Sequence, residues 1–70
     1  MNDENLAEAL TRETKRVRDV VIPAYIACGP GGVFALALMR RDLDSAMAAA
    51  LNGDVVAMLR AHEALKGWSL

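Results

Sequence analysis

Cys28-Gly29-Pro30-Gly31-Gly32 decides the fold, because this stretch interrupts a chain that otherwise favours helix. Gly29 suits the left-handed position that ends a helix, and Pro30 prevents the helix from continuing. The sequence therefore predicts an antiparallel helical hairpin, with helices over residues 3–27 and 33–51 joined by a loop at 28–32. The expected N-cap of the first helix is Asn2 or Asp3.

Pro23 is the irregular residue of the first predicted helix. Within a helix, proline removes one hydrogen bond and clashes with the carbonyl four residues earlier, at a cost of about 3 kcal/mol. The helix therefore either kinks at Pro23 or ends near Val21. We expect a kink, because the apolar spacing continues past Pro23. The expected seam, broken once by Glu13, consists of Leu6, Leu10, Val17, Val20, Ala24 and Ala27.

The second predicted helix begins with Val33–Met39, which is apolar on every face. Such a stretch needs burial on every side, and the first helix can cover only one of them. A chain of 70 residues with one cysteine and 54% hydrophobic residues also has more apolar surface than one thin core can bury. We therefore expect a homodimer. In the second half of this helix the expected inward residues are Leu43, Ala46, Met47 and Ala50, and the outward ones are Arg41, Asp44 and Ala48.

A third helix is predicted over residues 55–66, after the turn Asn52-Gly53-Asp54. Gly53 suits a positive φ and Asp54 is a good N-cap. The expected apolar stripe consists of Val55, Met58, Leu59, His62 and Leu65. The predicted fold is thus all-α: one domain over residues 1–70, built as an antiparallel helical hairpin plus a short third helix and assembled as a homodimeric bundle.

The charges of the two arms match in the register of this hairpin. Counted outward from the loop, Asp19 comes level with Arg40 and Arg41. Arg16 and Arg18 come level with the acidic residues Asp42 and Asp44. We therefore expect ion pairs between the arms, each worth about 0–1 kcal/mol when exposed.

The residues that could carry chemistry are too few for an enzyme. Cys28 and His62 provide two ligands where a closed zinc site needs four, and no nucleophile is spaced to pair with His62. Both are expected to be packing residues. The glycine loop lacks the Lys-Ser/Thr of a phosphate-binding loop. The sequence therefore predicts a non-enzymatic protein with no catalytic residue, no metal and no cofactor.

A net charge of −1 argues against a dedicated nucleic-acid partner. The twenty uncharged residues between Asp19 and Arg40 have the length of a membrane span. However, Pro23 and the glycine loop would leave backbone groups unsatisfied in lipid, so a buried hairpin tip is the better interpretation. With an acidic start unlike a signal peptide and one unpaired cysteine, the expected location is the cytoplasm.

Partner binding is the remaining role for six residues. Tyrosine and tryptophan are enriched at binding hot spots, and arginines beside the hairpin could dock an acidic surface. An equally acceptable interpretation is that the aromatic residues pack on each other or across the dimer. The candidate partner-binding residues are Tyr25, Phe34, Arg16, Arg40, Arg41 and Trp68.

The chain also resembles short proteins encoded by bacteriophages and prophages. The resemblance covers residues 22–67 and is carried by Ile22-Pro23-Ala24-Tyr25, Gly29–Ala35, Asp42-Leu43, Gly53–Leu59 and Glu63–Gly67. It is similar to the phage anti-activators of quorum sensing, which implies a helical-hairpin dimer that binds a LuxR-type regulator and a pilus assembly ATPase. No functional residue is carried over from that family.

The expected function is therefore that of a phage or prophage protein that binds and inhibits a host bacterial protein, such as a regulator, a motor or a defence component. Three alternatives stay open. One is a protein that sequesters a small molecule or nucleotide signal at a dimer seam lined by Arg40, Arg41 and Tyr25. The others are a DNA-binding accessory protein and a membrane-active small protein.

Overall fold

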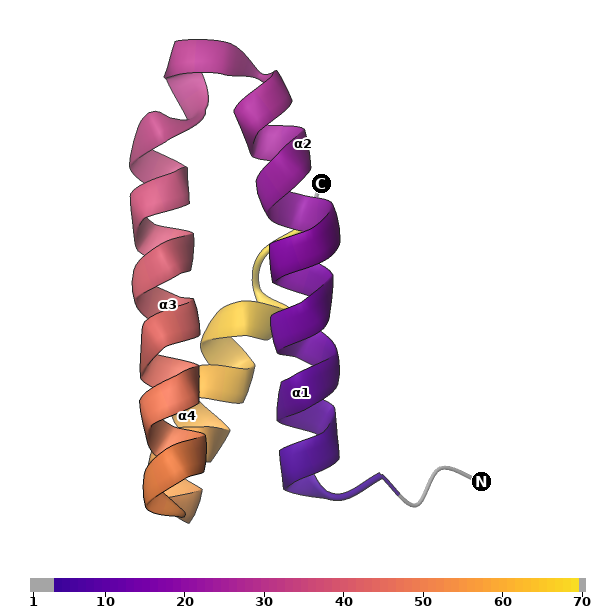
Figure 1. The fold of residues 1–70 in the computed structure, drawn as a ribbon, viewed down its shortest axis with the longest axis vertical. Coiled ribbons are helices and arrows are strands. Elements are labelled where there is room, and N and C mark those ends of the chain that lie inside the picture. Colours follow the sequence, from indigo (N-terminus) through magenta and orange to yellow (C-terminus); the bar gives the residue numbers. More distant parts are fainter. Residues whose placement is uncertain (1–3, 70) are drawn as a thin grey trace.

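Two antiparallel helical arms and a third helix that packs against both make up the fold (Figure 1). The structure is a computed structural model that describes residues 4–69. The first arm consists of α1 (Leu6–Arg16), the π-helical segment η1 (Val17–Val21) and α2 (Ile22–Ala27). The second arm is α3 (Val33–Asn52), and the third helix is α4 (Val55–Lys66). Residues 4–69 contain no strand, and the predicted all-α hairpin with a short third helix is confirmed.

Two glycines determine the shape of the hairpin turn. Gly29 has a φ of 81°, the left-handed conformation that ends α2, and Gly29–Gly32 then form a 3-10 turn, η2, within the expected loop at 28–32. Gly32 has a different role, because it lies against the opposite arm. A Cβ atom at Gly32 would come within 2.7 Å of the carbonyl oxygen of Tyr25. The absence of a side chain at this position therefore allows the two arms to approach each other.

Gly32→Ala is expected to destabilise the protein by about 1–3 kcal/mol, because a backbone carbonyl cannot move aside as a flexible side chain can. Gly31→Ala is the matched control. A Cβ at Gly31 meets no atom of the described residues within 4 Å, and its φ is not positive. This change should be neutral or stabilise by up to about 1 kcal/mol. Thermal unfolding followed by circular dichroism measures both, and equal effects would contradict the close approach at Gly32.

The first arm begins later than expected. Asn5 caps α1 by accepting a hydrogen bond from the Glu8 amide at 2.8 Å, and the helix starts at Leu6. The N-caps expected at Asn2 or Asp3 lie outside the described residues. Arg12 forms a bidentate ion pair with Glu4, with a shortest distance of 3.0 Å. This pair fixes the segment before the helix to its second turn.

Pro23 is accommodated without a break in the first arm. The helix continues to Ala27, so the alternative that it ends near Val21 is wrong. The turn before the proline widens to π-helix, and the amide of Ile22 donates to the carbonyl of Val17, five residues back. Prolines and single π turns are both recognised sites of kinks in helices.

The π segment shifts which residues of the first arm are buried. Val17 and Val21 are fully buried, whereas Val20 is 50% exposed and Ala27 is also exposed. The expected seam through Val20 and Ala27 is therefore wrong. A π turn holds more residues than an α turn, so the inward positions follow a spacing of four through this region.

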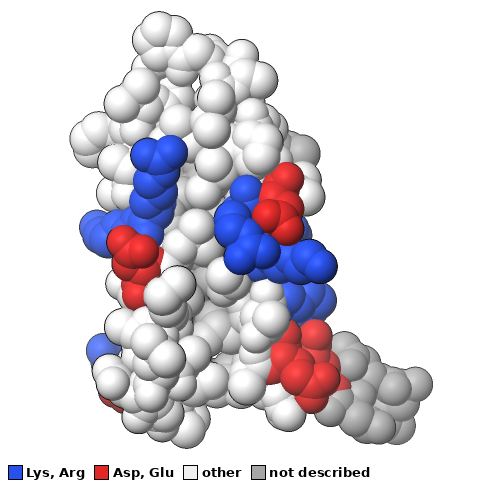
Figure 2. Space-filling view, viewed as in Figure 1, with Lys and Arg blue, Asp and Glu red and all other residues white. Residues whose placement is uncertain are grey.

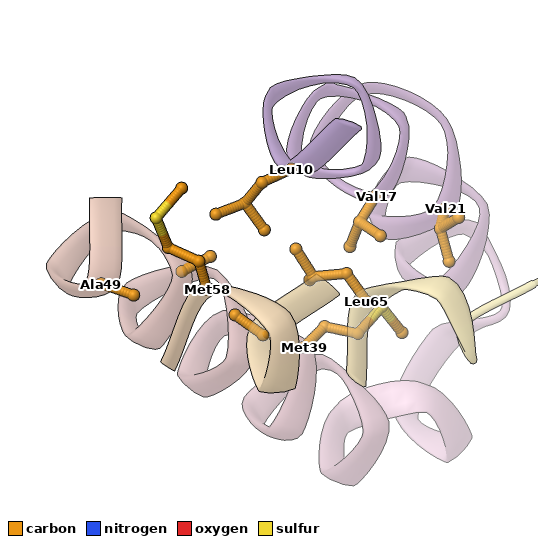
Figure 3. Close-up of a cluster of buried hydrophobic side chains, with 9 residues drawn as sticks. Leu10, Val17, Val21, Met39, Ala49, Met58 and Leu65 are labelled. Atoms are coloured by element: carbon orange, nitrogen blue, oxygen red, sulfur yellow. The ribbon is translucent and has the colours of Figure 1, made fainter. Parts of the chain in front are cut away.

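The core lies where α4 crosses the two arms (Figure 3). Leu65 of α4 is fully buried and lies between Val17 of the first arm and Met39 of α3. The other buried apolar residues are Leu10, Val21, Ala46, Ala49, Met58 and Ala61.

Burial of α3 and α4 differs in part from the expected faces. On α3, Met47 is 64% exposed and Ala50 is exposed, while Ala49 takes the inward position instead. On α4, the predicted stripe is correct at Met58 and Leu65. It is wrong at Val55 and Leu59, which are 59% and 51% exposed. These differences arise because α4 packs against both arms and thereby fixes which side of each helix faces the core. His62 is half-buried as expected, and its Nε2 atom is buried with no hydrogen-bond partner among the described residues.

Candidate protein-binding surfaces

The six candidate partner-binding residues fall into two groups in the structure. Phe34, Arg40 and Arg41 are exposed on the second arm. The other three, Arg16, Tyr25 and Trp68, are partly buried and bind residues of the same chain. The second group therefore has an internal structural role.

Arg16 binds the last residues of α4 and the segment after it, and so links them to the first arm. Its Nη2 donates hydrogen bonds to the carbonyl oxygens of Leu65 at 3.1 Å and Trp68 at 2.8 Å. Its Nε donates to Oε2 of Glu13 at 2.8 Å, and this carboxylate belongs to a residue that is only 6% exposed. One guanidinium thus pairs a buried acid and satisfies two carbonyls at the end of α4.

Trp68 binds α3, and Tyr25 of the first arm packs on Trp68. The indole Nε1 of Trp68 donates to Oδ2 of Asp42 on α3 at 2.9 Å. The rings of Tyr25 and Trp68 meet edge to face, with centroids 6.4 Å apart, and the Tyr25 hydroxyl donates to the carbonyl of Ser69 at 3.2 Å. The two aromatic residues therefore link both arms to the chain end.

The ion pairs expected between the arms are not formed among residues 4–69. Arg18 pairs with its neighbour Asp19 at 2.9 Å, and Arg41 pairs with its neighbour Asp42 at 3.5 Å. The hydrogen bond from Arg18 lowers the pKa of Asp19 below its usual value. Asp42 accepts a hydrogen bond from Trp68, in the segment after α4, and does not pair with Arg16 or Arg18 of the first arm.

The end of the hairpin carries an exposed apolar surface, which we call the tip patch and define as Ile26, Pro30 and Phe34. Phe34 is 79% exposed and Ile26 is 54% exposed. No charged residue occurs between Asp19 and Arg40, and Figure 2 shows an uncharged surface over the hairpin end. The expectation that the tip is buried is therefore wrong for the single chain. A solvent-exposed phenylalanine in an uncharged surface is typical of a protein-binding site.

A shallow groove of about 410 Å³ lies between α3 and α4. Its charged lining consists of Arg41, Arg60, Asp42 and Asp54, so that two positive and two negative side chains face it. This balance does not select an anion such as a nucleotide. Tyr25, which the alternative of a nucleotide-binding dimer seam places beside Arg40 and Arg41, packs on Trp68 of the same chain.

Other candidate chemistry is also absent from residues 4–69. No group of three or more potential metal ligands from His, Cys, Asp and Glu occurs there. Cys28 is exposed, which corrects the expectation that it is a packing residue. None of the helices in this part of the chain has both the length and the hydropathy that a membrane span requires.

The chain matches no protein-family model, no curated protein and no solved structure. The exposed surfaces of the chain are therefore the features that point to a function. Phe34, a candidate from the sequence, is exposed, and so is Leu51 at the other end of α3, which is 82% exposed and was not among the candidates. An apolar residue at a helix end gives no sequence signal that distinguishes a core position from a surface position.

Proposed function

We propose that this protein acts without catalysis, by binding a host bacterial protein through the tip patch and blocking it. The observation that carries the proposal is the 79% exposure of Phe34 at the end of an uncharged hairpin. Burying an aromatic side chain at an interface releases about 2 kcal/mol or more, and such residues dominate binding free energies. The complementary surface on the target is an apolar groove wide enough for one aromatic ring.

The charges below the tip support a specific partner over general adhesion. Arg18 and Asp19 lie on the first arm where the uncharged stretch ends, and both signs are present. Polar rims of mixed charge exclude wrong partners because like charges repel at short distance. The resemblance to phage proteins makes a cytoplasmic regulator, motor or defence component the proposed target.

Affinity capture from bacterial lysate tests this proposal with Phe34→Ser as the variant. Leu59→Ser is the matched control, since Leu59 is an apolar residue that is 51% exposed on α4, outside the tip patch. We expect the wild type and the control to retain the same host protein, and Phe34→Ser to lose it by about tenfold or more. Equal capture by Phe34→Ser would place the binding site elsewhere.

Inhibition is tested separately on the captured protein. The purified target should lose its own activity as the wild-type chain is added in a one-to-one titration. Phe34→Ser should leave that activity unchanged at the same concentrations. A target that binds tightly but keeps its full activity would contradict the blocking role while leaving the binding role intact.

A further inference from the structure

The solvent-facing side of α3 carries one row of residues with coiled-coil spacing. Their positions alternate in steps of four and three, which keeps them on one face of a helix. All of them are exposed in the single chain, and Leu51, Met47 and Val33 are 82%, 64% and 62% exposed. We call this row the α3 seam and define it as Val33, Ala37, Arg40, Asp44, Met47 and Leu51.

The α3 seam is symmetrical about its centre. Apolar residues occupy both ends and the two charged residues occupy the middle, at equal distances from Asp42. If a second copy of α3 lies antiparallel against this face, Val33 meets Leu51 of the other copy and Ala37 meets Met47. Arg40 then meets Asp44, and each of these contacts occurs twice because a two-fold axis relates the copies.

The charges select this orientation over the parallel one. In a parallel pair, Arg40 would face Arg40 and Asp44 would face Asp44, and like charges in direct contact are unfavourable. Neither Arg40 nor Asp44 forms an ion pair with another residue in the range 4–69, so both are available for the partner copy. In Figure 2, basic and acidic side chains lie close together halfway along α3.

One contact opposes association. Arg41 lies beside the seam near the two-fold axis, where it would approach Arg41 of the other copy. Its guanidinium already pairs with Asp42 at 3.5 Å, which reduces the net repulsion. Because the seam supplies two reciprocal Arg40–Asp44 pairs at the same level, the charge balance near the axis stays favourable.

We propose that the α3 seam is the interface of a two-fold homodimer in which the two copies of α3 pack antiparallel. The occupant of this face is a second copy of the same chain, because the row is complementary to itself in charge and in apolar character. The interface is distinct from the tip patch, so it does not depend on the proposed function. Since a helix rises about 1.5 Å per residue, the 20 residues of α3 hold the two tip patches about 30 Å apart, facing opposite ends.

Charge reversal tests the interface, with sedimentation velocity as the measurement. Wild-type protein should sediment at twice the chain mass of 7.5 kDa. Arg40→Asp places two acids opposite each other at both reciprocal contacts, and Asp44→Arg places two bases there. Each variant alone should dissociate to monomer, with association weakened by about tenfold or more. Both positions are exposed, so circular dichroism should show an unchanged helical fold.

The decisive measurement is made on an equimolar mixture of the two variants. Each contact between an Arg40→Asp chain and an Asp44→Arg chain again joins opposite charges, so the mixture should return to the dimer mass. A dimer through any other face would not respond to mixing. Monomeric wild type, single variants that remain dimeric, or a mixture that remains monomeric would overturn the proposal. None of these outcomes bears on target capture through Phe34.

Discussion

Leu65→Ala is expected to lower the free energy of unfolding by about 3–5 kcal/mol, the largest effect of any single substitution considered for this chain. Leu65 is fully buried and lies between Val17 of the first arm and Met39 of α3. Its loss leaves a cavity at the place where all three helical segments meet. Domains of this size rarely exceed about 5 kcal/mol in total stability, so the variant should be largely unfolded at room temperature.

Leu59→Ala provides the control for this prediction, because the same atoms are removed from a side chain that is 51% exposed. Leu59→Ala should lower the free energy of unfolding by less than about 1 kcal/mol. Urea unfolding followed by far-ultraviolet circular dichroism compares the two variants. An equal loss of stability in Leu65→Ala and Leu59→Ala would contradict the packing of α4 between the two arms.

Arg16→Met should lower the free energy of unfolding by about 2–3 kcal/mol, which is the second largest expected effect. It should also release the segment after α4 from the first arm. The substitution removes the hydrogen bonds to the carbonyls of Leu65 and Trp68 and leaves Glu13 as a buried carboxylate without its closest cation. Trp68 is the only tryptophan of the chain, so its fluorescence reports the release directly. Its emission should shift to longer wavelength as the indole enters water.

Two comparisons separate the roles of Arg16. Arg12→Met removes an arginine that is 55% exposed and pairs with Glu4, and it should leave the stability nearly unchanged without a fluorescence shift. The double variant Arg16→Met with Glu13→Leu removes the buried charge as well and should recover part of the stability. It should retain the shifted emission. An unshifted emission in Arg16→Met would contradict the role of Arg16 in holding Trp68.

The candidate site was only partly predictable from the sequence. Phe34 and the two arginines Arg40 and Arg41 are on the surface, as a binding role requires. Tyr25 and Trp68 have the same residue types as binding hot spots, yet they are partly buried and pack on each other. Nothing in the pattern of the last residues indicates that the chain folds back onto both arms after Gly67. The pairing of Arg16 with this segment joins residues 52 positions apart, which local spacing cannot predict.

The sequence by itself determined where the helices end. Gly29 and Gly53 have the positive φ values of 81° and 64° that were expected at helix ends, and Asp54 accepts a hydrogen bond from the amide of Ala57. These features depend on backbone preferences and on atoms within a few residues, so they can be read locally.

Tertiary structure decided which side of each helix is buried. The first half of α3 is apolar on every face, so the sequence contains no contrast that selects Met39 for the core and leaves Val33 in water. The packing of α4 against both arms makes that choice, and the π turn before Pro23 moves burial from Val20 to Val21. Burial depends on which elements meet in space, and for a chain rich in alanine, leucine, valine and methionine several arrangements satisfy the same pattern.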